Sequence, residues 1–452
     1  MVSHAPAAAV LLEGEPVTSL AEYRRRGGLA AWEHAADGDP AQVIDVIRQA
    51  GLRGRGGAGF PTAIKWDNLR RTDAVAKYVV CNGAEGEPGT FKDRLLLMHN
   101  PYQALEGLAI AARVLNAKSA YLGVKRLFQP LLPGLERALA ELREAGVGGD
   151  IQIVWGPDEY LFGEEKALLS VIEGGLPLPR VLPPYLQGLF TGAYGGPSEE
   201  LSNPTVVNNV ETLSHVPHIL AKGAAWFRSR GTQETPGTMV FSVLGDVRRP
   251  AIRELPLGVT VRELIDEVAG GVREGRSVKA VLPGLAGAVI TGAMLETPLG
   301  FDSMRQAGSA LGSGGFIVYD DTACMVDVAR NFARFLYIES CNQCPPCKIG
   351  ARRITERLER LLEFDAHAHD LEEIAETATW VTNGQRCALA TSTQIVTSSL
   401  LAGFPDDFGA HVRGDCALRH DLRLPKITAY DPDNGFTSDA DYWRKQPDWS
   451  YV

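Results

Sequence analysis

Three cysteines, Cys341, Cys344 and Cys347, fall within seven residues of this 452-residue chain, and Cys387 follows them. Thiolates are the usual protein ligands of iron–sulfur clusters, and a run of three with a distant fourth suits one [4Fe–4S] cubane. Structural zinc is the main alternative, although zinc sites prefer paired Cys-x-x-Cys motifs. Unligated thiols are the other alternative. The spacing therefore favours an iron–sulfur cluster on these four residues.

The remaining cysteines, Cys81, Cys324 and Cys416, stand isolated in the sequence. Free cysteines commonly behave as small buried hydrophobes, and we expect this of all three. The crowding of the other four argues for metal binding rather than for disulfides in a cytoplasmic protein.

A glycine-rich stretch offers a second chemical feature. Gly54-x-Gly56-x-x-Gly59 matches the dinucleotide-binding fingerprint by letter, but a helix rather than a strand is expected before it, so a generic Rossmann site is not indicated. Backbone of this kind can still approach a phosphate or a flavin ring closely. Arg53, Arg55 and Lys65 place positive charge beside it.

Composition narrows the class of protein. The formal net charge is −10, and no basic run indicates nucleic-acid binding. No apolar stretch reaches the about 18–20 residues of a membrane helix. The first residues, 1–12, lack the basic and long apolar regions of a signal peptide. We therefore expect a cytoplasmic protein of about two to four domains, either free or peripheral on a membrane complex.

The elements that must position these residues follow from local patterns. Asp39-Pro40 predicts a helix start and Gly51 its end. From about residue 75 to 210, apolar strands alternate with amphipathic helices, which predicts an α/β domain with a largely parallel sheet. The predicted strands are 78–81, 120–124 and 151–155, and the predicted helices are 105–115, 131–144 and 164–172.

A different pattern of predicted secondary structure begins at Thr238. A predicted hairpin through Ile252, a capping box at Thr260 and Glu263, and further strands to Val318 indicate a small α+β module of β-grasp type. From residue 326 the chain is predicted to be helical, with Asp370 as one helix cap. We expect Pro345-Pro346 to keep the cysteine loop out of a helix, and residues from 415 onward to pack as an extended tail.

Ordered motifs make the chain resemble a known family, the NADH-oxidising flavoprotein subunit of respiratory complex I, with the diaphorase subunits of NAD-linked hydrogenases and formate dehydrogenases. The resemblance runs from about residue 23 to 404. It rests on the segments 51–66 (GLRGRGGAGFPTAIKW), 81–94 (CNGAEGEPGTFKDR), 163–165 (GEE), 203–212 (NPTVVNNVET), 339–347 (ESCNQCPPC) and 382–389.

The resemblance implies a Rossmann-like α/β domain for FMN and NADH, a β-grasp (ubiquitin-like) domain and a C-terminal helical bundle carrying the cluster. The implied organisation is 1–74, an N-terminal helical segment with the flavin loop; 75–236, the FMN- and NADH-binding domain; 237–325, the β-grasp domain; 326–414, the helical [4Fe–4S] domain; and 415–452, the tail.

The resemblance also implies cofactor-binding residues. FMN would be lined by Gly54, Arg55, Gly56, Gly57, Gly59, Lys65, Asn82, Glu85, Asn208 and Asn209. The nucleotide would be held by Glu87, Gly163, Glu164 and Glu165, with Phe60, Tyr160 and Tyr185 as aromatic surfaces. Simpler interpretations exist: a helix dipole for the glutamate pair, turn backbone for the asparagines, a solvated surface position for Lys65, and core packing for each aromatic residue.

The implied chemistry is hydride transfer from NADH to FMN and single-electron transfer through the [4Fe–4S] cluster to a partner. Positioning and tuning of the cofactors are the protein's tasks, so we expect no catalytic side chain. Because the chain lacks a second cluster motif, the resemblance implies a thioredoxin-like [2Fe–2S] partner subunit and a larger oxidoreductase acceptor.

Departures from the family pattern leave alternatives open. Ala84 stands where the family carries Asp, Gly86 where it carries Ser, Lys166 where it carries Thr, and Asn68 where it carries an aromatic residue. Ala84, with its lost carboxylate, and Lys166 together raise the alternative of a cofactor-bearing scaffold that does not oxidise NADH. Lys166 raises the alternative of a subunit that accepts NADPH.

Overall fold

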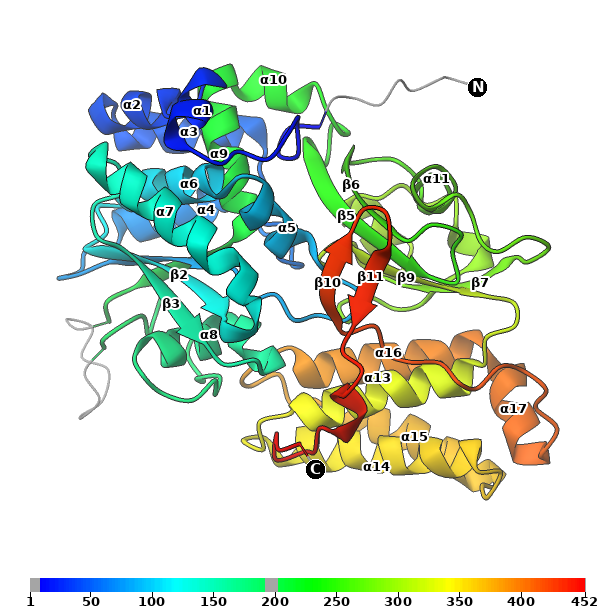
Figure 1. The fold of residues 1–452 in the computed structure, drawn as a ribbon. Coiled ribbons are helices and arrows are strands. Elements are labelled where there is room, and N and C mark those ends of the chain that lie inside the picture. Colours follow the sequence, from blue (N-terminus) through cyan, green and yellow to red (C-terminus); the bar gives the residue numbers. More distant parts are fainter. Residues whose placement is uncertain (1–8, 192–201, 452) are drawn as a thin grey trace. The chain divides into compact units, whose positions relative to one another are not determined.

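The computed structural model describes residues 9–191 and 202–451, and the chain forms two compact units (Figure 1). The first unit comprises Met1–Glu85, Lys92–Phe241 and Arg253–Gly258. The second comprises Gly86–Phe91, Ser242–Ile252 and Val259–Val452. Within the described ranges, none of the helices has both the length and the apolar character needed to cross a membrane.

The first unit is built on a parallel sheet in the order β3-β2-β1-β4. Its strands are β1 (Tyr78–Asn82), β2 (Ser119–Lys125), β3 (Ile151–Gly156) and β4 (Thr205–Asn209). The helices between strands are α5 (Lys92–His99), α6 (Pro101–Val114), α7 (Leu132–Glu144) and α8 (Glu165–Ile172), and α9 (Val210–Lys222) follows β4. The prediction of a largely parallel α/β unit is confirmed.

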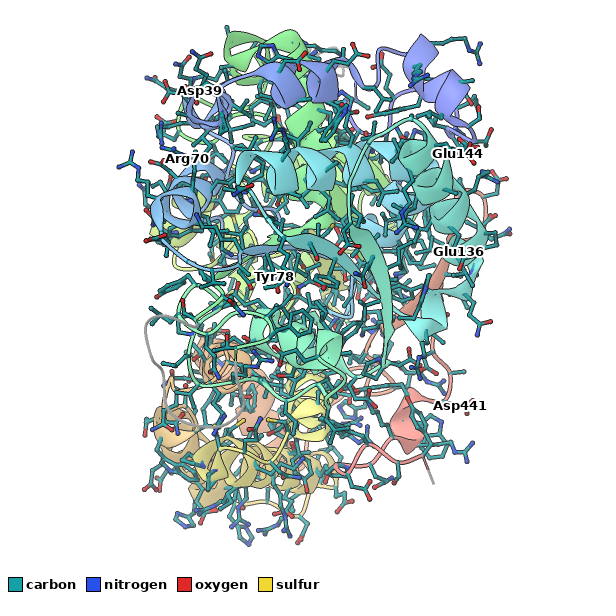
Figure 2. All side chains as sticks on the ribbon, turned by 90° about the vertical axis from the view of Figure 1, so that its left-hand side faces the viewer. Asp39, Arg70, Tyr78, Glu136, Glu144 and Asp441 are labelled. Atoms are coloured by element: carbon teal, nitrogen blue, oxygen red, sulfur yellow. The ribbon has the colours of Figure 1, made fainter. Side chains whose placement is uncertain are left out.

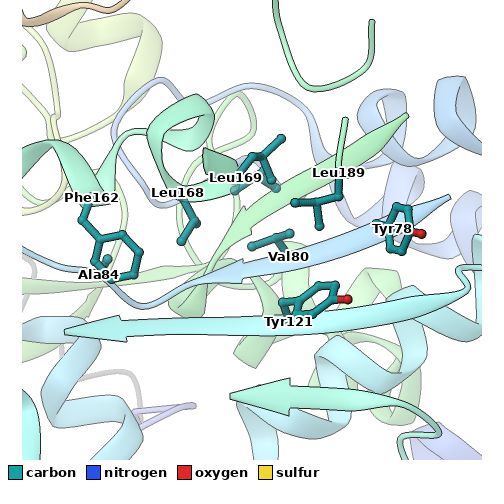
Figure 3. Packing of buried hydrophobic residues seen from close by; sticks show 9 residues of the cluster. Tyr78, Val80, Ala84, Tyr121, Phe162, Leu168, Leu169 and Leu189 are labelled. Carbon is teal, nitrogen blue, oxygen red and sulfur yellow. The ribbon is translucent and has the colours of Figure 1, made fainter. Parts of the chain in front are cut away.

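Helices cover both faces of this sheet, with α6, α7 and α9 on one side and α8 on the other (Figure 1). The face under α8 is a continuous apolar core in which Leu168 and Leu169 pack over Val80 and Tyr121 (Figure 3). Burial on both faces explains why the strands are almost uniformly apolar rather than alternating.

Before the sheet lie α1 (Leu20–Arg25), α2 (Ala30–Asp37), α3 (Pro40–Ala50) and α4 (Thr62–Arg71). The predicted limits of α3 are confirmed, because Asp39 accepts the Ala41 N–H and Gly51 adopts φ 73° at the C-cap. Asp39 lies at the outer edge of the unit, as do Glu136 and Glu144 on the polar face of α7 (Figure 2).

The second unit holds a mixed sheet in the order β6-β5-β9-β7-β8. The strands are β5 (Thr238–Gly245), β6 (Ala251–Pro256), β7 (Val278–Leu282), β8 (Ile290–Thr291) and β9 (Gly315–Asp320), and β5 and β6 begin or end in the first unit. The predicted capping box at Thr260 and Glu263 is present at α11 (Val261–Glu263), and a π-helical turn, Leu264–Val268, continues it. The short helix α12 (Phe301–Gln306) also belongs to this unit, whereas α10 (Ala224–Arg228) belongs to the first unit.

The end of the chain is helical, with α13 (Met325–Glu339), α14 (Pro345–Leu362), α15 (Ala368–Trp380), α16 (Leu389–Gly403) and α17 (Pro405–Arg413). Two local predictions were wrong. Pro345 and Pro346 occupy the first positions of α14 instead of excluding a helix, because the N–H groups lost there have no intrahelical acceptor. Asp370 is the third helical residue of α15, where it accepts the N–H of the N-cap His367.

The tail is also more ordered than the sequence predicts. It forms a two-stranded antiparallel ladder from β10 (Ile427–Asp431) and β11 (Gly435–Ser438). Beyond it, Tyr442 and Lys445 are buried and both donate to the buried Glu339 carboxylate, at 2.9 Å each. The expectation that the tail packs as an extended segment is confirmed, while the ladder and the contacts with Glu339 are long-range features that local polarity could not reveal.

Candidate functional site

The carboxyl edge of the parallel sheet provides the frame of the site. Strands β2 and β3 lie on one side of β1 and β4 lies on the other, so the order reverses between β1 and β4. Asn82 and Asn209, the last residues of these two strands, are in register, as are Cys81 and Asn208. Ligands of open α/β sheets bind at such a reversal, outside the carboxyl ends of the strands.

The glycine loop lies against this edge. A Cβ atom on Gly56 would come within 3.1 Å of the Asn209 Cβ, so glycine permits the close approach. Gly57 and Gly59 have φ values of 127° and 64°, which favour glycine. The loop is closed by the Gly54 N–H, which donates to the Phe60 carbonyl at 2.9 Å. Such a cradle of backbone fits a phosphate or a flat ring system.

Arg55 anchors the loop from beneath. Its guanidinium is fully buried and donates to the carbonyls of Arg53, Pro236 and Thr238 at 3.0–3.2 Å, while its N–H donates to Thr212 at 2.8 Å. Burial lowers the pKa of Arg55 to about 10. The charge of this side chain is thus directed to the protein interior and fixes the loop backbone.

Helix α4 brings Lys65 and Trp66 to the same edge. The Lys65 ammonium donates to the Val207 carbonyl at 2.8 Å and pairs with Glu165 at 3.3 Å. The buried Trp66 indole donates to the Asn208 side chain at 2.9 Å. Lys65 is therefore held in place instead of extending freely into solvent, and Asn208 does more than complete a turn.

The segments after β1 and before α8 are joined across the edge. The Asn82 amide donates to the Gly163 carbonyl at 2.7 Å, and its oxygen accepts the Ala84 N–H at 3.1 Å. A Cβ atom on Gly163 would come within 2.8 Å of the Ala84 carbonyl oxygen, so this position requires glycine. The methyl group of Ala84 is buried in the core beneath.

Glu164 and Glu165 have different environments. Glu164 is the N-cap of α8 and accepts the N–H groups of Lys166 and Ala167 at 2.9 and 3.0 Å. Burial nevertheless raises the pKa of Glu164 to about 7, because it outweighs these hydrogen bonds. Glu165 is the partner of Lys65. Glu164 is therefore a helix cap, as the simpler interpretation held. Both N–H groups bind its Oε2, so its Oε1 can still accept a hydrogen bond from a ligand.

A buried charge network supports the edge. Lys92 donates to Glu211 at 2.6 Å, to Asp93 at 3.1 Å and to Asn209 at 3.2 Å. The Glu85 carboxylate accepts from the Asp93 N–H at 3.2 Å and from Arg94 at 2.8 Å. Sequence reasoning noted the Lys92-Asp-Arg94 motif but named none of its residues as part of the site, because their buried partner Glu211 lies more than a hundred residues away.

The three aromatic candidates are not core residues. Phe60 is 52% exposed and Tyr185 is 62% exposed, and Tyr160 is partly exposed. Core packing, the simpler interpretation of each, is therefore wrong for Phe60 and Tyr185. Glu87 lies in the second unit, where its carboxylate accepts the Leu285 N–H at 2.6 Å and the Ser313 hydroxyl.

The cysteine loop lies between α13 and α14. Cys344 is the N-cap of α14 and Cys347 lies in its first turn. The Ser340 hydroxyl is 3.3 Å from the Cys347 sulfur, and the Gln343 amide donates to the Cys341 sulfur at 3.5 Å. Burial raises the pKa of the Cys347 thiol, and Cys341 and Cys344 raise it further. Cys387 lies in the loop that precedes α16.

Four free cysteine side chains are the donor set that a cubane takes. Each thiolate of a cubane binds a different iron, so the four sulfurs need not converge on one point. Neighbouring hydroxyl and amide groups can hydrogen-bond to the sulfurs, a common means of setting cluster potential.

Comparisons with known proteins match the segments that contain the glycine loop and the cysteine loop. Residues 47–218 match the family described as "Nuo51 FMN-binding domain", and residues 327–411 match "NADH-ubiquinone oxidoreductase-F iron-sulfur binding region". An F subunit of the NADH-quinone oxidoreductase of Rhizobium meliloti is 38% identical, with 87% of this chain and 94% of that protein covered. The corresponding F subunit from Escherichia coli K12 is 35% identical, with 89% and 91% covered.

Hydrogenase subunits are also similar. The HndC subunit of the NADP-reducing hydrogenase of Solidesulfovibrio fructosivorans is 34% identical, with 82% of this chain and 76% of that protein covered. A crystal structure of an NAD⁺-reducing [NiFe]-hydrogenase in its H₂-reduced state superposes with a TM-score of 0.76 at 36% identity. The match covers 85% of this chain but 64% of that chain, so this chain spans less than two thirds of its length.

Proposed function

The chain belongs to the family of NADH-quinone oxidoreductase F subunits, and we propose that it binds FMN and NADH at the carboxyl edge between β1 and β4. The observation that carries this assignment is the approach of Gly56 to Asn209, which sets the glycine loop on the reversal point of the sheet. When bound, FMN accepts a hydride and releases electrons singly, which suits a nicotinamide donor and an iron–sulfur acceptor.

Membership of the family confirms several predictions made from the sequence. The chain is an NADH-oxidising flavoprotein subunit, with FMN and a [4Fe–4S] cluster as its cofactors. Its relatives are subunits of larger oxidoreductase complexes, so it works with partner subunits.

We propose the following roles for the residues of the edge. The backbone of residues 54–59 cradles the flavin phosphate and ring, and Lys65 supplies the positive charge. Asn82, Asn208 and Asn209 offer amide groups from the strand ends, while Glu85 and Arg55 hold these segments in place from below. Glu164, Glu165 and Gly163 border the nucleotide, and the exposed rings of Phe60, Tyr160 and Tyr185 provide stacking surfaces. For Glu87, which Leu285 and Ser313 fix within the second unit, contact with the nucleotide stays a prediction.

We propose that Cys341, Cys344, Cys347 and Cys387 hold the cluster, through which electrons leave one at a time. We also propose the finer organisation predicted above, with boundaries near residues 74, 236, 325 and 414. The strand order β6-β5-β9-β7-β8, with β5 and β9 parallel at its centre, supports a β-grasp module. The packing of α13 on α14 and α16 supports a bundle around the cysteine loop.

The proposed partner is a thioredoxin-like [2Fe–2S] subunit, with a larger oxidoreductase beyond it and a location in the cytoplasm or on the surface of a membrane complex. The alternative of NADPH use rests on Lys166, and the similarity to the HndC subunit of an NADP-reducing hydrogenase adds weak support. The scaffold alternative rests on Ala84 and Lys166.

Anaerobic titration of the purified, FMN-loaded chain with NADH tests the proposal. We expect the flavin absorbance to bleach with about one NADH per flavin, because hydride transfer is a two-electron step. NADPH in a parallel titration separates the two nucleotides. Bound FMN that NADH does not bleach would favour the scaffold.

A further inference from the structure

Four side chains of the second unit that the proposed function does not use converge on one point: Cys324, His411, Cys416 and His420. One donor atom of each lies within 4.8 Å of the donor atoms of the other three. Cys324 Sγ is 3.1 Å from His411 Nε2, and Cys416 Sγ is 3.2 Å from His420 Nε2. We propose that these residues form a structural zinc site, separate from the iron–sulfur cluster.

The donor set and its dimensions match tetrahedral zinc. Cys₂His₂ is among the standard closed zinc sites, with bonds of about 2.3 Å to sulfur and about 2.0 Å to nitrogen. Such bonds place neighbouring donor atoms about 3.3–3.8 Å apart, so the four atoms here need only small movements to close on an ion. The short sequence intervals are also typical, with Cys416 and His420 separated by three residues.

The His411 ring is already oriented as a ligand. Its Nδ1 lies 2.9 Å from the Leu361 carbonyl, so Nδ1 carries the proton and the Nε2 lone pair faces Cys324. Metal-binding histidines are commonly fixed by a second hydrogen bond of this kind. Phe364 stacks on the same ring at a centroid distance of 5.1 Å, which further limits its rotation.

The backbone also brings the ligand-bearing segments together. The Cys324 N–H donates to the Arg419 carbonyl at 3.1 Å, and the Arg419 N–H donates to the Thr322 carbonyl at 2.9 Å. At the start of α17, Asp407 accepts the Met325 N–H at 2.9 Å and pairs with Lys279 at 2.7 Å. The cluster is thus assembled by three segments that are fixed independently of any ion.

Other roles for these thiols fit less well. Cys324 and His411 are 0% and 1% exposed, so a nucleophile–base pair here would have no access to substrate. A disulfide between Cys324 and Cys416 would leave two convergent imidazoles without a purpose. Four protein ligands leave no open position for a substrate, so the ion would be structural: it would fasten residues 415–420 to the start of α13.

The prediction of a buried thiol is confirmed for Cys324, but the prediction that Cys324 and Cys416 stand isolated is wrong. Cys416 is partly exposed, and the two thiols belong to one cluster. Three of the four ligands lie outside the segments that match the family, which span residues 47–218 and 327–411. The inference does not depend on the proposed function, since NADH oxidation and zinc content are measured separately.

The test uses the purified full-length chain with its cofactors. We expect elemental analysis to give about one zinc beside about four irons per chain. Zinc-edge X-ray absorption, which is blind to iron, should show two sulfur ligands at about 2.3 Å and two nitrogen ligands at about 2.0 Å. No zinc after expression in zinc-supplemented medium, an all-sulfur shell, or a Cys324–Cys416 disulfide in peptide mass analysis would overturn the proposal.

Substitution of the proposed ligands tests whether the zinc ion is bound at this cluster. Cys416→Ala and His420→Ala should each lower zinc content at least fivefold while iron and FMN content are unchanged. His369→Ala is the matched control, because His369 is an exposed histidine of the same unit that pairs with Glu372 and Glu373. Zinc retained in both variants would contradict the assignment. If a variant does not fold, the absorption spectrum of the unmodified chain still decides the outcome.

Discussion

Lys65 and Glu165 form an ion pair at 3.3 Å although they are 100 residues apart in the sequence. Both side chains are partly exposed, so the pair itself contributes at most about 1 kcal/mol to stability. Its importance is geometric. With a second hydrogen bond to the Val207 carbonyl, two of the three ammonium protons are engaged within the described part of the chain. The remaining proton can serve a bound anion or a flavin oxygen beside the glycine loop.

Replacing Lys65 tests this role. Loss of a charge-assisted hydrogen bond costs about 1.5–3 kcal/mol, so Lys65→Met should weaken FMN binding about 10–100-fold. Quenching of flavin fluorescence during titration of the FMN-free chain gives the dissociation constant. Lys118→Met, a change at an exposed lysine before β2, should leave it within about twofold. Equal affinities for the Lys65 variant and the parent would contradict the assignment.

Glu164 should make stability depend on pH. Burial raises its pKa from 4.5 to about 7, so the folded chain holds a proton that the unfolded chain has lost above pH 4.5. Stability therefore falls as pH rises from about 4.5 to 7 and then levels off, by an amount on the order of 3 kcal/mol.

Glu164→Gln removes this titration, so thermal melting of the variant and the parent should diverge across that pH range, with the parent losing more. The comparison is made on FMN-free chains, so that ligand binding does not contribute. Glu136→Gln, at an exposed position on α7, provides the control. Parallel melting curves for Glu164→Gln and the parent from pH 5 to 7 would refute the role of Glu164.

Local sequence rules predicted individual elements well and their long-range contacts poorly. Asp39, Pro40 and Gly51 define α3 because caps act within a few residues, and the capping box of Thr260 and Glu263 was found for the same reason. The same rules wrongly placed Pro345 in a loop. Proline is unfavourable inside a helix but favourable at its first position, so the prediction depends on knowing where the helix begins.

The parts that escaped prediction depend on pairs far apart in the chain. Nothing near Lys92 in the sequence indicates that it meets Glu211, and nothing near Cys324 indicates that it meets His411. The short interval from His411 through Cys416 to His420 was a signal that could have been used. The candidate flavin and cluster residues came instead from the resemblance to a family. The family's motifs occur in this chain in the same order, and they point to residues that are far apart in the sequence but are expected to meet in the fold.

Lys166 should affect the choice of nucleotide. It lies in the first turn of α8, with its ammonium 3.9 Å from Glu164, where it can offset the repulsion between that carboxylate and a 2′-phosphate. Lys166→Thr should therefore lower kcat/KM for NADPH at least tenfold and change that for NADH by less than about threefold. Steady-state kinetics with both nucleotides measures the ratio. A parent enzyme that already prefers NADH by several orders of magnitude would rule out this explanation.

The Lys92 ammonium is the cation that neutralises the buried carboxylates of Asp93 and Glu211. It is 1% exposed, and burial alone would lower its pKa, but Asp93 and Glu211 outweigh that effect and raise it, so the ammonium stays charged. Lys92→Met leaves two buried carboxylates without their cation, a change that typically costs about 3–5 kcal/mol. The apparent melting temperature should fall by on the order of 10 °C.

The double variant Lys92→Met/Glu211→Gln separates charge from packing. It removes one orphaned carboxylate while keeping an acceptor for the Val240 N–H, which Glu211 binds at 2.8 Å. We expect it to melt above the single variant, because an unpaired buried charge costs more than the loss of the whole pair. Lys118→Met should melt with the parent. If the double variant is no more stable than the single one, the methylene packing of Lys92, and not its charge, is what holds this edge of the sheet.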